Sequence, residues 1–252
     1  MQRMQPLVNR FILIGSFFAA LSLSSSYTMT DGCHQELPAI VKGYQEPRNL
    51  EKSFLTILRD KTTKTGHFRE TVEKLIPFLV GRVSECLDYQ DILIQTPVVD
   101  EYAGTQLANR IMFVPVLRSG EALLEGFRAY FPDASVRHIL VQRNEETAQA
   151  YFLYSKLPES ISAHQKIIIL EPMIATGGSL EIVINKLKEK GALESNIIVA
   201  SVVAAPEGLH KLAELFPDIC VTVLAIDAGL NDRKYIVPGL GDFGDRYYGT
   251  GA

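Results

Sequence analysis

The sequence predicts an α/β domain built on a mostly parallel sheet with helices on its faces. Three observations lead to this fold class. Short apolar runs alternate with helical patterns from about residue 49 onward. In one of the helical segments the apolar residues recur with the spacing of an α-helix. The run before that segment is apolar almost throughout, which is typical of a strand covered on both faces, as in a parallel sheet.

The composition is that of an ordinary globular protein and excludes several function classes. The chain has 252 residues, of which 47% are hydrophobic, and 25 basic and 29 acidic residues give a net charge of −4. Collagen-like, low-complexity and disordered chains are excluded. The acidic balance argues against binding to nucleic acid by phosphate neutralisation.

The cysteines and histidines show no metal-binding or redox pattern. Cys33, Cys86 and Cys220 lie far apart with no C-x-x-C pair, and the five histidines form no H-E-x-x-H spacing. We therefore expect a reduced protein whose own side chains form no metal site.

Residues 1–28 have the outline of a secretory signal peptide. Arg3 and Arg10 precede an uncharged run from Phe11 to Leu23, and a serine cluster follows. This run is too short to span a bilayer as a stable helix. The alternatives are a misassigned start codon, with Met29 as the true first residue, or a disordered extension. We expect a poorly ordered lead-in over 29–48 and one functional domain over 49–252.

The elements of that domain can be assigned in order along the chain. A helix is expected over 67–87, and Pro77 should kink or split it. Residues 149–155 alternate aromatic and polar residues like an edge hairpin. Further helices are expected at 121–131, 180–190 and 206–216. Strands are expected at 91–99, 111–117, 136–141, 166–170, 197–203 and 220–226.

The helix after residue 179 has the strongest pattern. Its apolar residues recur at i, i+3, i+4 and i+7, and Gly191 follows as a stop signal; they are Leu180, Val183, Ile184 and Leu187.

The loop before that helix has the residues that a phosphate site requires. It reads Glu171-Pro-Met-Ile-Ala-Thr-Gly-Gly-Ser179. Ligands of open α/β sheets bind at the carboxyl ends of strands, and a helix amino terminus favours anions. Glycines let the backbone approach a phosphate, hydroxyls add donors, and Glu171 is placed to accept hydrogen bonds from sugar hydroxyls. The alternative is a turn with a Ser or Thr cap. A Walker A loop is excluded because no lysine follows the glycines.

The nine-residue string closely resembles the phosphoribosyl-diphosphate-binding motif of type I phosphoribosyltransferases, in the form typical of uracil phosphoribosyltransferases. The resemblance extends from about Leu50 to Thr250. Val114-Pro-Val-Leu-Arg-Ser-Gly120 resembles the pyrophosphate loop of that family. Gln142-Arg-Asn-Glu-Glu-Thr147 resembles the base of its flexible flap, and the stretch from Tyr235 to Thr250 resembles its base-binding segment.

The resemblance implies an activity and a set of site residues. The reaction would transfer ribose 5-phosphate from phosphoribosyl diphosphate to N1 of uracil, giving uridine monophosphate and pyrophosphate in pyrimidine salvage. Asp242 and Arg143 would be catalytic. Uracil would be bound by Ile236, Gly241, Asp242 and Phe243. Phosphoribosyl diphosphate would be bound by Arg118, Arg143, Glu171, Pro172, Met173, Ile174, Ala175, Thr176, Gly177, Gly178, Ser179 and Asp242.

The resemblance also implies further features of the molecule. These are a small carboxyl-terminal hood over the base, a flexible β-hairpin flap, Mg²⁺ bound through the diphosphate substrate, a possible GTP effector and a homo-oligomer. No nucleic-acid or membrane partner is expected. The substrates and the free thiols of Cys86 and Cys220 indicate a cytoplasmic protein. The alternative is an exported protein, if residues 1–28 act as a signal peptide.

Three departures from the family pattern favour a second hypothesis. Glu171 replaces an aspartate, Phe243 replaces an alanine, and Ser119-Gly-Glu-Ala122 replaces A-G-L-G. The alternative function is a catalytically weak regulatory homologue that binds phosphoribosyl diphosphate or uracil.

Overall fold

The computed structural model describes residues 37–143, 150–163 and 165–251. The signal-peptide-like segment 1–28 and the first part of the expected lead-in lie outside these residues. The side chain of Arg143 and the residues that follow it, up to 149, are also outside the described part.

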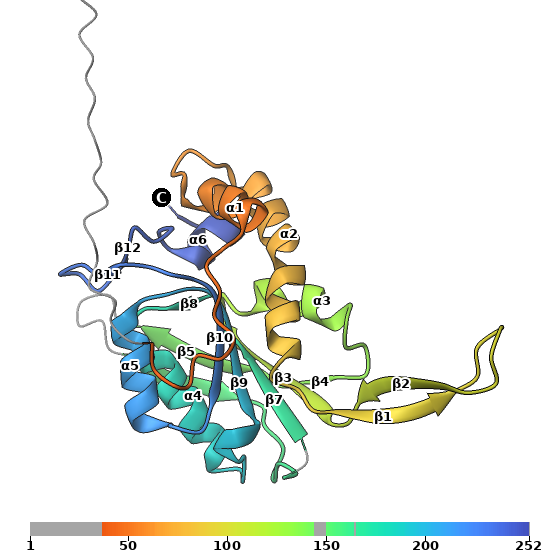
Figure 1. The fold of residues 1–252 in the computed structure, drawn as a ribbon. Coiled ribbons are helices and arrows are strands. Elements are labelled where there is room, and N and C mark those ends of the chain that lie inside the picture. Colours follow the sequence, from red (N-terminus) through yellow and green to blue (C-terminus); the bar gives the residue numbers. More distant parts are fainter. Residues whose placement is uncertain (1–36, 144–149, 164, 252) are drawn as a thin grey trace, which may run out of the picture. The chain divides into compact units, whose positions relative to one another are not determined.

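The described chain forms an α/β domain around a mostly parallel sheet, as predicted (Figure 1). The sheet has the strand order β10-β9-β7-β3-β5-β6, and the pairs along it are parallel except β5 with β6. The short strands β4 and β8 pair with β3 and β9. The strands are β3 (Arg110–Leu117), β4 (Ser135–Val136), β5 (Ile139–Arg143), β6 (Ala150–Ser155), β7 (Gln165–Leu170), β8 (Met173–Ile174), β9 (Ile197–Ala204) and β10 (Cys220–Ile226). The strand expected at 136–141 is thus divided between β4 and β5.

Helices cover both faces of the sheet, and most lie where the sequence predicts them. The helix around Pro77 is continuous, so the proline does not split it. Buried residues on both sides of Pro77 hold the helix together, among them Val72 and Val80. The helices are α1 (Asn49–Arg59), α2 (Thr65–Ser84), α3 (Glu121–Arg128), α4 (Gly178–Lys188), α5 (Pro206–Leu215) and α6 (Phe243–Tyr248), with a 3₁₀ turn η1 at Glu194–Asn196.

The alternation of side chains along the central strand β7 divides the apolar interior into two cores. Ile168 belongs to the core formed with α2 and α3, which includes Phe68 and Phe127. Ile167 and Ile169 belong to the core formed with α4 and α5. The continuous apolar run is therefore required because each face of the strand meets helices.

An exposed hairpin extends from the sheet where a single strand was expected at 91–99. Strands β1 (Tyr89–Ile94) and β2 (Tyr102–Leu107) pair in antiparallel register and project from the body of the domain (Figure 1). The single-strand prediction was wrong because the second half of that run lies in the turn. We call residues 89–107 the arm. Its apolar side chains are unusually exposed, with Leu93 at 71% and Val98 at 91%.

Residues 37–48 pack against the domain instead of forming a poorly ordered lead-in. The side chain of Ile40 is buried. Backbone hydrogen bonds join Val221 N–H to the carbonyl of Ile40 at 2.7 Å and Lys42 N–H to the carbonyl of Val221 at 3.1 Å. This short segment therefore adds a pairing at the edge strand β10, which the expected boundary at residue 49 missed.

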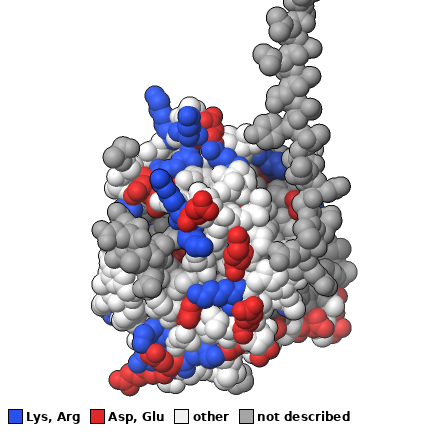
Figure 2. All heavy atoms as spheres, turned by 90° about the vertical axis from the view of Figure 1, so that its left-hand side faces the viewer, with Lys and Arg blue, Asp and Glu red and all other residues white. Residues whose placement is uncertain are grey.

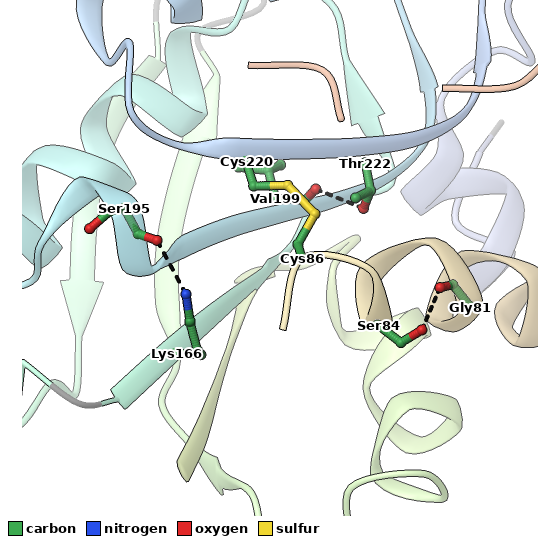
Figure 3. The surroundings of a disulfide bond; sticks show 8 residues. All are labelled: Gly81, Ser84, Cys86, Lys166, Ser195, Val199, Cys220 and Thr222. Atoms are coloured by element: carbon green, nitrogen blue, oxygen red, sulfur yellow. Dashed lines mark hydrogen bonds between the residues drawn. A yellow bond between two sulfur atoms is a disulfide. The ribbon is translucent and has the colours of Figure 1, made fainter. Parts of the chain in front are cut away.

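Cys86 and Cys220 form a disulfide bond, so the expectation of free thiols at these positions was wrong (Figure 3). Cys86 follows the end of α2, and Cys220 begins β10, with their Cα atoms 6.8 Å apart. The packing of α2 against β10 brings together two cysteines separated by 134 positions, a distance at which sequence spacing gives no signal. Cys33 lies outside the described residues.

The face of the molecule in Figure 2 has acidic and basic side chains interspersed, without a continuous basic surface on the part that is described. In the described ranges, no helix combines the length and apolar character needed to cross a bilayer. The same ranges contain no cluster of three or more His, Cys, Asp or Glu side chains placed to hold a metal ion.

Candidate active site

A cavity of about 830 Å³, including the solvent at its mouth, opens where β7 meets α4. Two segments form most of its walls. The first, residues 171–179, we call the phosphate loop, and the second, residues 236–243, we call the base loop. Most of the residues predicted for the site line this one cavity: Glu171, Met173, Ile174, Ala175, Thr176, Gly177, Gly178, Ser179, Ile236, Gly241, Asp242 and Phe243.

The phosphate loop presents a helix amino terminus to the cavity. Gly177 has a φ of +74°, a left-handed conformation that favours glycine, and α4 begins at the next residue. The N-cap residue Gly177 has no capping side chain, and Thr176 Oγ1 accepts only a long hydrogen bond from the N–H of Gly178, at 3.5 Å. A Thr cap therefore accounts for at most one of the N–H groups at the start of α4. Uncapped N–H groups and the positive end of the helix dipole can bind an anion here.

Glu171 is the carboxyl at the start of the phosphate loop. Its pKa is raised from 4.5 to about 8, mainly because the surrounding protein desolvates it; a hydrogen bond from the backbone of Met173 lowers the pKa in part, and the nearby Asp242 carboxylate makes a smaller contribution that raises it. The unliganded site therefore holds this carboxyl mainly in its protonated form at neutral pH.

The base loop ends at the first residue of α6, Phe243. Asp242 caps this helix by accepting a hydrogen bond from the backbone N–H of Asp245 at 2.8 Å. Gly241 has a φ of +80°. The carboxyl-terminal part of the chain also contains a small antiparallel pair, β11 (Gly229–Leu230) and β12 (Ile236–Val237), so a compact substructure borders the cavity.

The side chain of Phe243 packs into the core and is only 2% exposed. Its ring centroid lies 5.5 Å from that of Phe68 and 5.9 Å from that of Tyr247. The substitution of phenylalanine for the family alanine therefore fills the interior behind the base loop. It gives no direct support for a narrowed base pocket.

Arg118 is held by the carboxyl-terminal segment. Its guanidinium donates to Asp245 Oδ1 at 2.7 Å and to Thr250 Oγ1 at 3.1 Å, and the hydroxyl of Tyr248 donates to its carbonyl at 3.1 Å. The side chain is half exposed. Arg118 is outside the cavity lining, although its neighbour Ser119 is part of it.

One further predicted residue, Pro172, is also outside the lining. Pro172 is buried, and its carbonyl accepts hydrogen bonds from Val202 and Val203 of β9 at 2.9 and 3.1 Å. It therefore joins the phosphate loop to the sheet. Arg143 ends β5, and its side chain is not described.

The cavity also includes five residues that were not among the predicted site residues, namely Ser119, Ala150, Leu180, Lys234 and Tyr235. Ser119 and Tyr235 do lie within the predicted pyrophosphate loop and base-binding segment. Lys234 has a φ of +64°. The turn that contains it is closed by Asn231, whose Oδ1 accepts from the N–H groups of Arg233 and Tyr235 at 3.0 Å each. The adjacent basic pair after an Asn-Asp turn was a signal that could have identified this position.

The mostly parallel sheet, with the phosphate loop at the carboxyl end of β7, has the fold of a type I phosphoribosyltransferase. The family model described as uracil phosphoribosyltransferase matches residues 46–250. The chain belongs to the uracil phosphoribosyltransferase family.

Relatives and a solved structure agree with this assignment. A protein named uracil phosphoribosyltransferase from Dictyostelium discoideum is 39% identical over 199 residues, which cover 79% of this chain and 92% of that protein. One of the same name from Streptococcus equi subsp. zooepidemicus is 44% identical over 196 residues, covering 78% and 92%. A solved structure described as the AQ2163 protein of Aquifex aeolicus superposes with a TM-score of 0.72 at 33% identity, covering 81% of this chain and 97% of that one.

Proposed function

We propose that this protein is a pentosyltransferase that transfers ribose 5-phosphate from phosphoribosyl diphosphate to N1 of uracil, giving uridine monophosphate and pyrophosphate. The observation that supports it is the meeting of the phosphate loop and the base loop at one cavity in a member of this family. The reaction belongs to pyrimidine salvage.

The two ends of the sugar diphosphate are assigned to different groups. The 5-phosphate binds at residues 176–179, where the amino terminus of α4 and two hydroxyls supply donors. The leaving diphosphate binds Arg118 and Arg143, because guanidinium forks match phosphate oxygens. Arg118 exchanges or shares its contacts with Asp245 and Thr250 when the diphosphate arrives. The N–H groups of these two arginines then stabilise the negative charge that develops on the leaving diphosphate.

The two carboxyls of the cavity are assigned to the sugar and to the site of reaction. Glu171 contacts the ribose hydroxyls, where its protonated form can both donate and accept a hydrogen bond. Asp242 lies at the junction of the base loop and α6 and faces the developing positive charge of the sugar carbon. Uracil contacts the backbone groups of the base loop at Ile236, Gly241 and Phe243.

Magnesium is proposed as the cofactor, bound through oxygens of the diphosphate and ribose. The cavity suits a hard cation because its polar lining consists largely of oxygen donors, among them Ser119, Thr176 and Ser179. Bound there, the ion neutralises charge on the diphosphate.

The experiment for this function is a turnover assay with the full chain, uracil, phosphoribosyl diphosphate and Mg²⁺. Formation of uridine monophosphate is expected, and Arg118→Met should lower kcat/KM about a hundredfold or more through loss of a charge-assisted contact. Arg128→Met supplies the control, because Arg128 is an arginine on the surface of α3 that pairs with Glu125. The absence of turnover with any common nucleobase would contradict the proposal.

We also propose a homo-oligomer in which the arm contacts a second copy of the chain. An isolated two-stranded hairpin is marginally stable in water, and this one exposes Leu93, Val98 and Tyr102. Val98→Asp should shift the protein to a smaller species in sedimentation velocity, whereas Asp100→Asn in the same turn should not. A monomeric unsubstituted protein would contradict this arrangement.

The remaining proposals come from family membership and substrate chemistry. A GTP effector is proposed without assignment of a site, and its test is the turnover rate with and without GTP. A cytoplasmic location is proposed from the intracellular sugar-diphosphate substrate alone, because the thiol argument is removed by the Cys86–Cys220 bond. Its test is fractionation with mass determination of the native amino terminus.

A further inference from the structure

One ion pair outside the cavity lining holds both backbone groups of Gly239 in the base loop. The guanidinium of Arg59 binds both carboxylate oxygens of Asp227, at 2.6 and 2.8 Å. The same guanidinium donates to the carbonyl of Gly239 at 2.8 Å, and the N–H of Gly239 donates to Asp227 Oδ2 at 2.8 Å. The pair and the residue thus form a closed set of four hydrogen bonds.

This residue lies at the tightest point of the base loop. Gly239 has a φ of +60°, and a Cβ there would lie 2.2 Å from the carbonyl oxygen of Ile236. The turn therefore brings Ile236 close to Gly239 and directs the chain on to Gly241. The position of Gly239 determines the direction in which the next amide and carbonyl groups point.

The ion pair is anchored in the interior of the domain. Arg59 is the last residue of α1, after the fully buried Leu58, and Asp227 follows β10 directly. The side chain of Asp227 is only 2% exposed. A carboxylate at such a site is unfavourable without its partner, so the pair has one strongly preferred geometry. Because both members of the pair are hydrogen-bonded to Gly239, the position of the pair fixes the position of Gly239 in the base loop.

A second arginine, Arg246 of α6, joins the following residue of the base loop to the same end of α1. Arg246 donates to the carbonyl of Leu240 at 2.7 Å and to the carbonyl of Asp60 at 2.6 Å. Its guanidinium lies 4.5 Å from the ring centroid of Phe68. Two consecutive carbonyls of the base loop, at 239 and 240, are therefore bound by guanidinium groups.

We propose that Arg59 and Asp227 are positioning residues that hold the base loop in the conformation that recognises uracil. This inference rests on the proposed function, in which backbone groups of residues 236–243 bind the base. Phosphoribosyl diphosphate binds mainly at the other loop. Loss of the pair therefore weakens uracil binding and leaves the binding of the sugar diphosphate largely unchanged.

Arg59→Lys tests the proposal, and Arg82→Lys is its matched control. Lysine keeps the charge but lacks the rigid planar fork that bridges a carboxylate and a carbonyl. Arg82 has the same kind of contacts, with Glu51 at 2.6 Å and with the carbonyls of Val223 and Leu224 in β10. Both arginines are mostly buried. Of these two arginines, Arg59 contacts the base loop, whereas Arg82 donates to Glu51 and to β10.

The expected result is a KM for uracil about tenfold higher in Arg59→Lys, with the KM for phosphoribosyl diphosphate within about twofold, since a small displacement of the base contacts is costly. Arg82→Lys should leave both constants within about twofold. Amide hydrogen exchange at residues 239–243 should be faster in Arg59→Lys and unchanged in Arg82→Lys. If Arg59→Lys does not fold, Asp227→Asn replaces it in the test. The same changes in the KM for uracil and in amide exchange are expected for Asp227→Asn.

Equal rises in both KM values, no rise in either, or the same rise in Arg82→Lys would overturn the proposal. Faster exchange without a change in the KM for uracil would overturn the role in base recognition while leaving the proposed function intact. Absence of uracil turnover in the unsubstituted protein would instead overturn the proposed function. The exchange measurement would then still decide whether the pair holds the loop.

Discussion

Glu171→Gln should change how the stability of the protein depends on pH. The unfolded carboxyl has a pKa near 4.5, and in the folded protein desolvation raises it to about 8. Between these values the unfolded chain has released the proton and the folded chain has kept it. The stability that proton binding contributes is therefore full below pH 4.5 and is lost as the pH rises through 8.

The size of this effect follows from the difference between the two pKa values. Integrated over pH, that difference corresponds to at most about 5 kcal/mol. By its accessible surface Glu171 is only partly buried, so contact with water should reduce the effect to about 2–3 kcal/mol. Glutamine at this position is neutral throughout and lacks the dependence.

Urea unfolding followed by circular dichroism at several pH values from 5 to 9 measures the effect. The free energy of unfolding of the unsubstituted protein should fall relative to Glu171→Gln across this range. Glu125→Gln, at an exposed carboxylate paired with Arg128, should run parallel to the unsubstituted protein. Parallel curves for the unsubstituted protein and Glu171→Gln would show that Glu171 is ionised at neutral pH and would refute the reasoning.

Phe243→Ala should lower the free energy of unfolding by about 3–5 kcal/mol because it leaves a cavity in the core. A changed choice of base without loss of stability in urea unfolding would contradict this packing. Reduction of the Cys86 disulfide should remove at most about 5 kcal/mol by the entropy of the long closed loop, and lower Tm by roughly 10 °C in calorimetry. Alkylation of Cys86 in the folded protein without reductant would show that the bond is absent. Gly120→Ala should prevent stable folding, because a Cβ would lie 2.1 Å from the carbonyl oxygen of Leu170. Gly178→Ala, whose Cβ would meet its nearest atom at 3.6 Å, should fold normally in the same thermal melts.

Features that depend on local pattern could be predicted from the sequence. The alternation of strands and helices, and the apolar spacing of Leu180 and Leu187, follow from periodicities that short segments contain. The phosphate loop could be located because a strand, two glycines and a helix start are contiguous. Its residues do line one cavity with the base loop.

Features that depend on tertiary contacts could not be predicted. The bond between Cys86 and Cys220 requires α2 to cross β10, and the packing of Ile40 requires a free position at the edge of β10. The pair of Arg59 and Asp227 joins residues 168 positions apart. Each partner alone resembles an ordinary surface charge until the fold is known.

The residues that depart from the family pattern lie in different parts of the structure. Phe243 fills the core between the rings of Phe68 and Tyr247. Its size therefore affects the stability of the domain more directly than the choice of base. Ser119 lines the cavity and adds a hydroxyl donor. Glu171 is the substituted carboxyl that lines the cavity, where it is desolvated and close enough to Asp242 to feel its charge. Phe243 therefore no longer supports the hypothesis of a catalytically weak homologue, and that hypothesis now depends on Glu171. In the proposed function a protonated carboxyl at this position can still bind ribose hydroxyls, so Glu171 alone does not argue against the proposed activity.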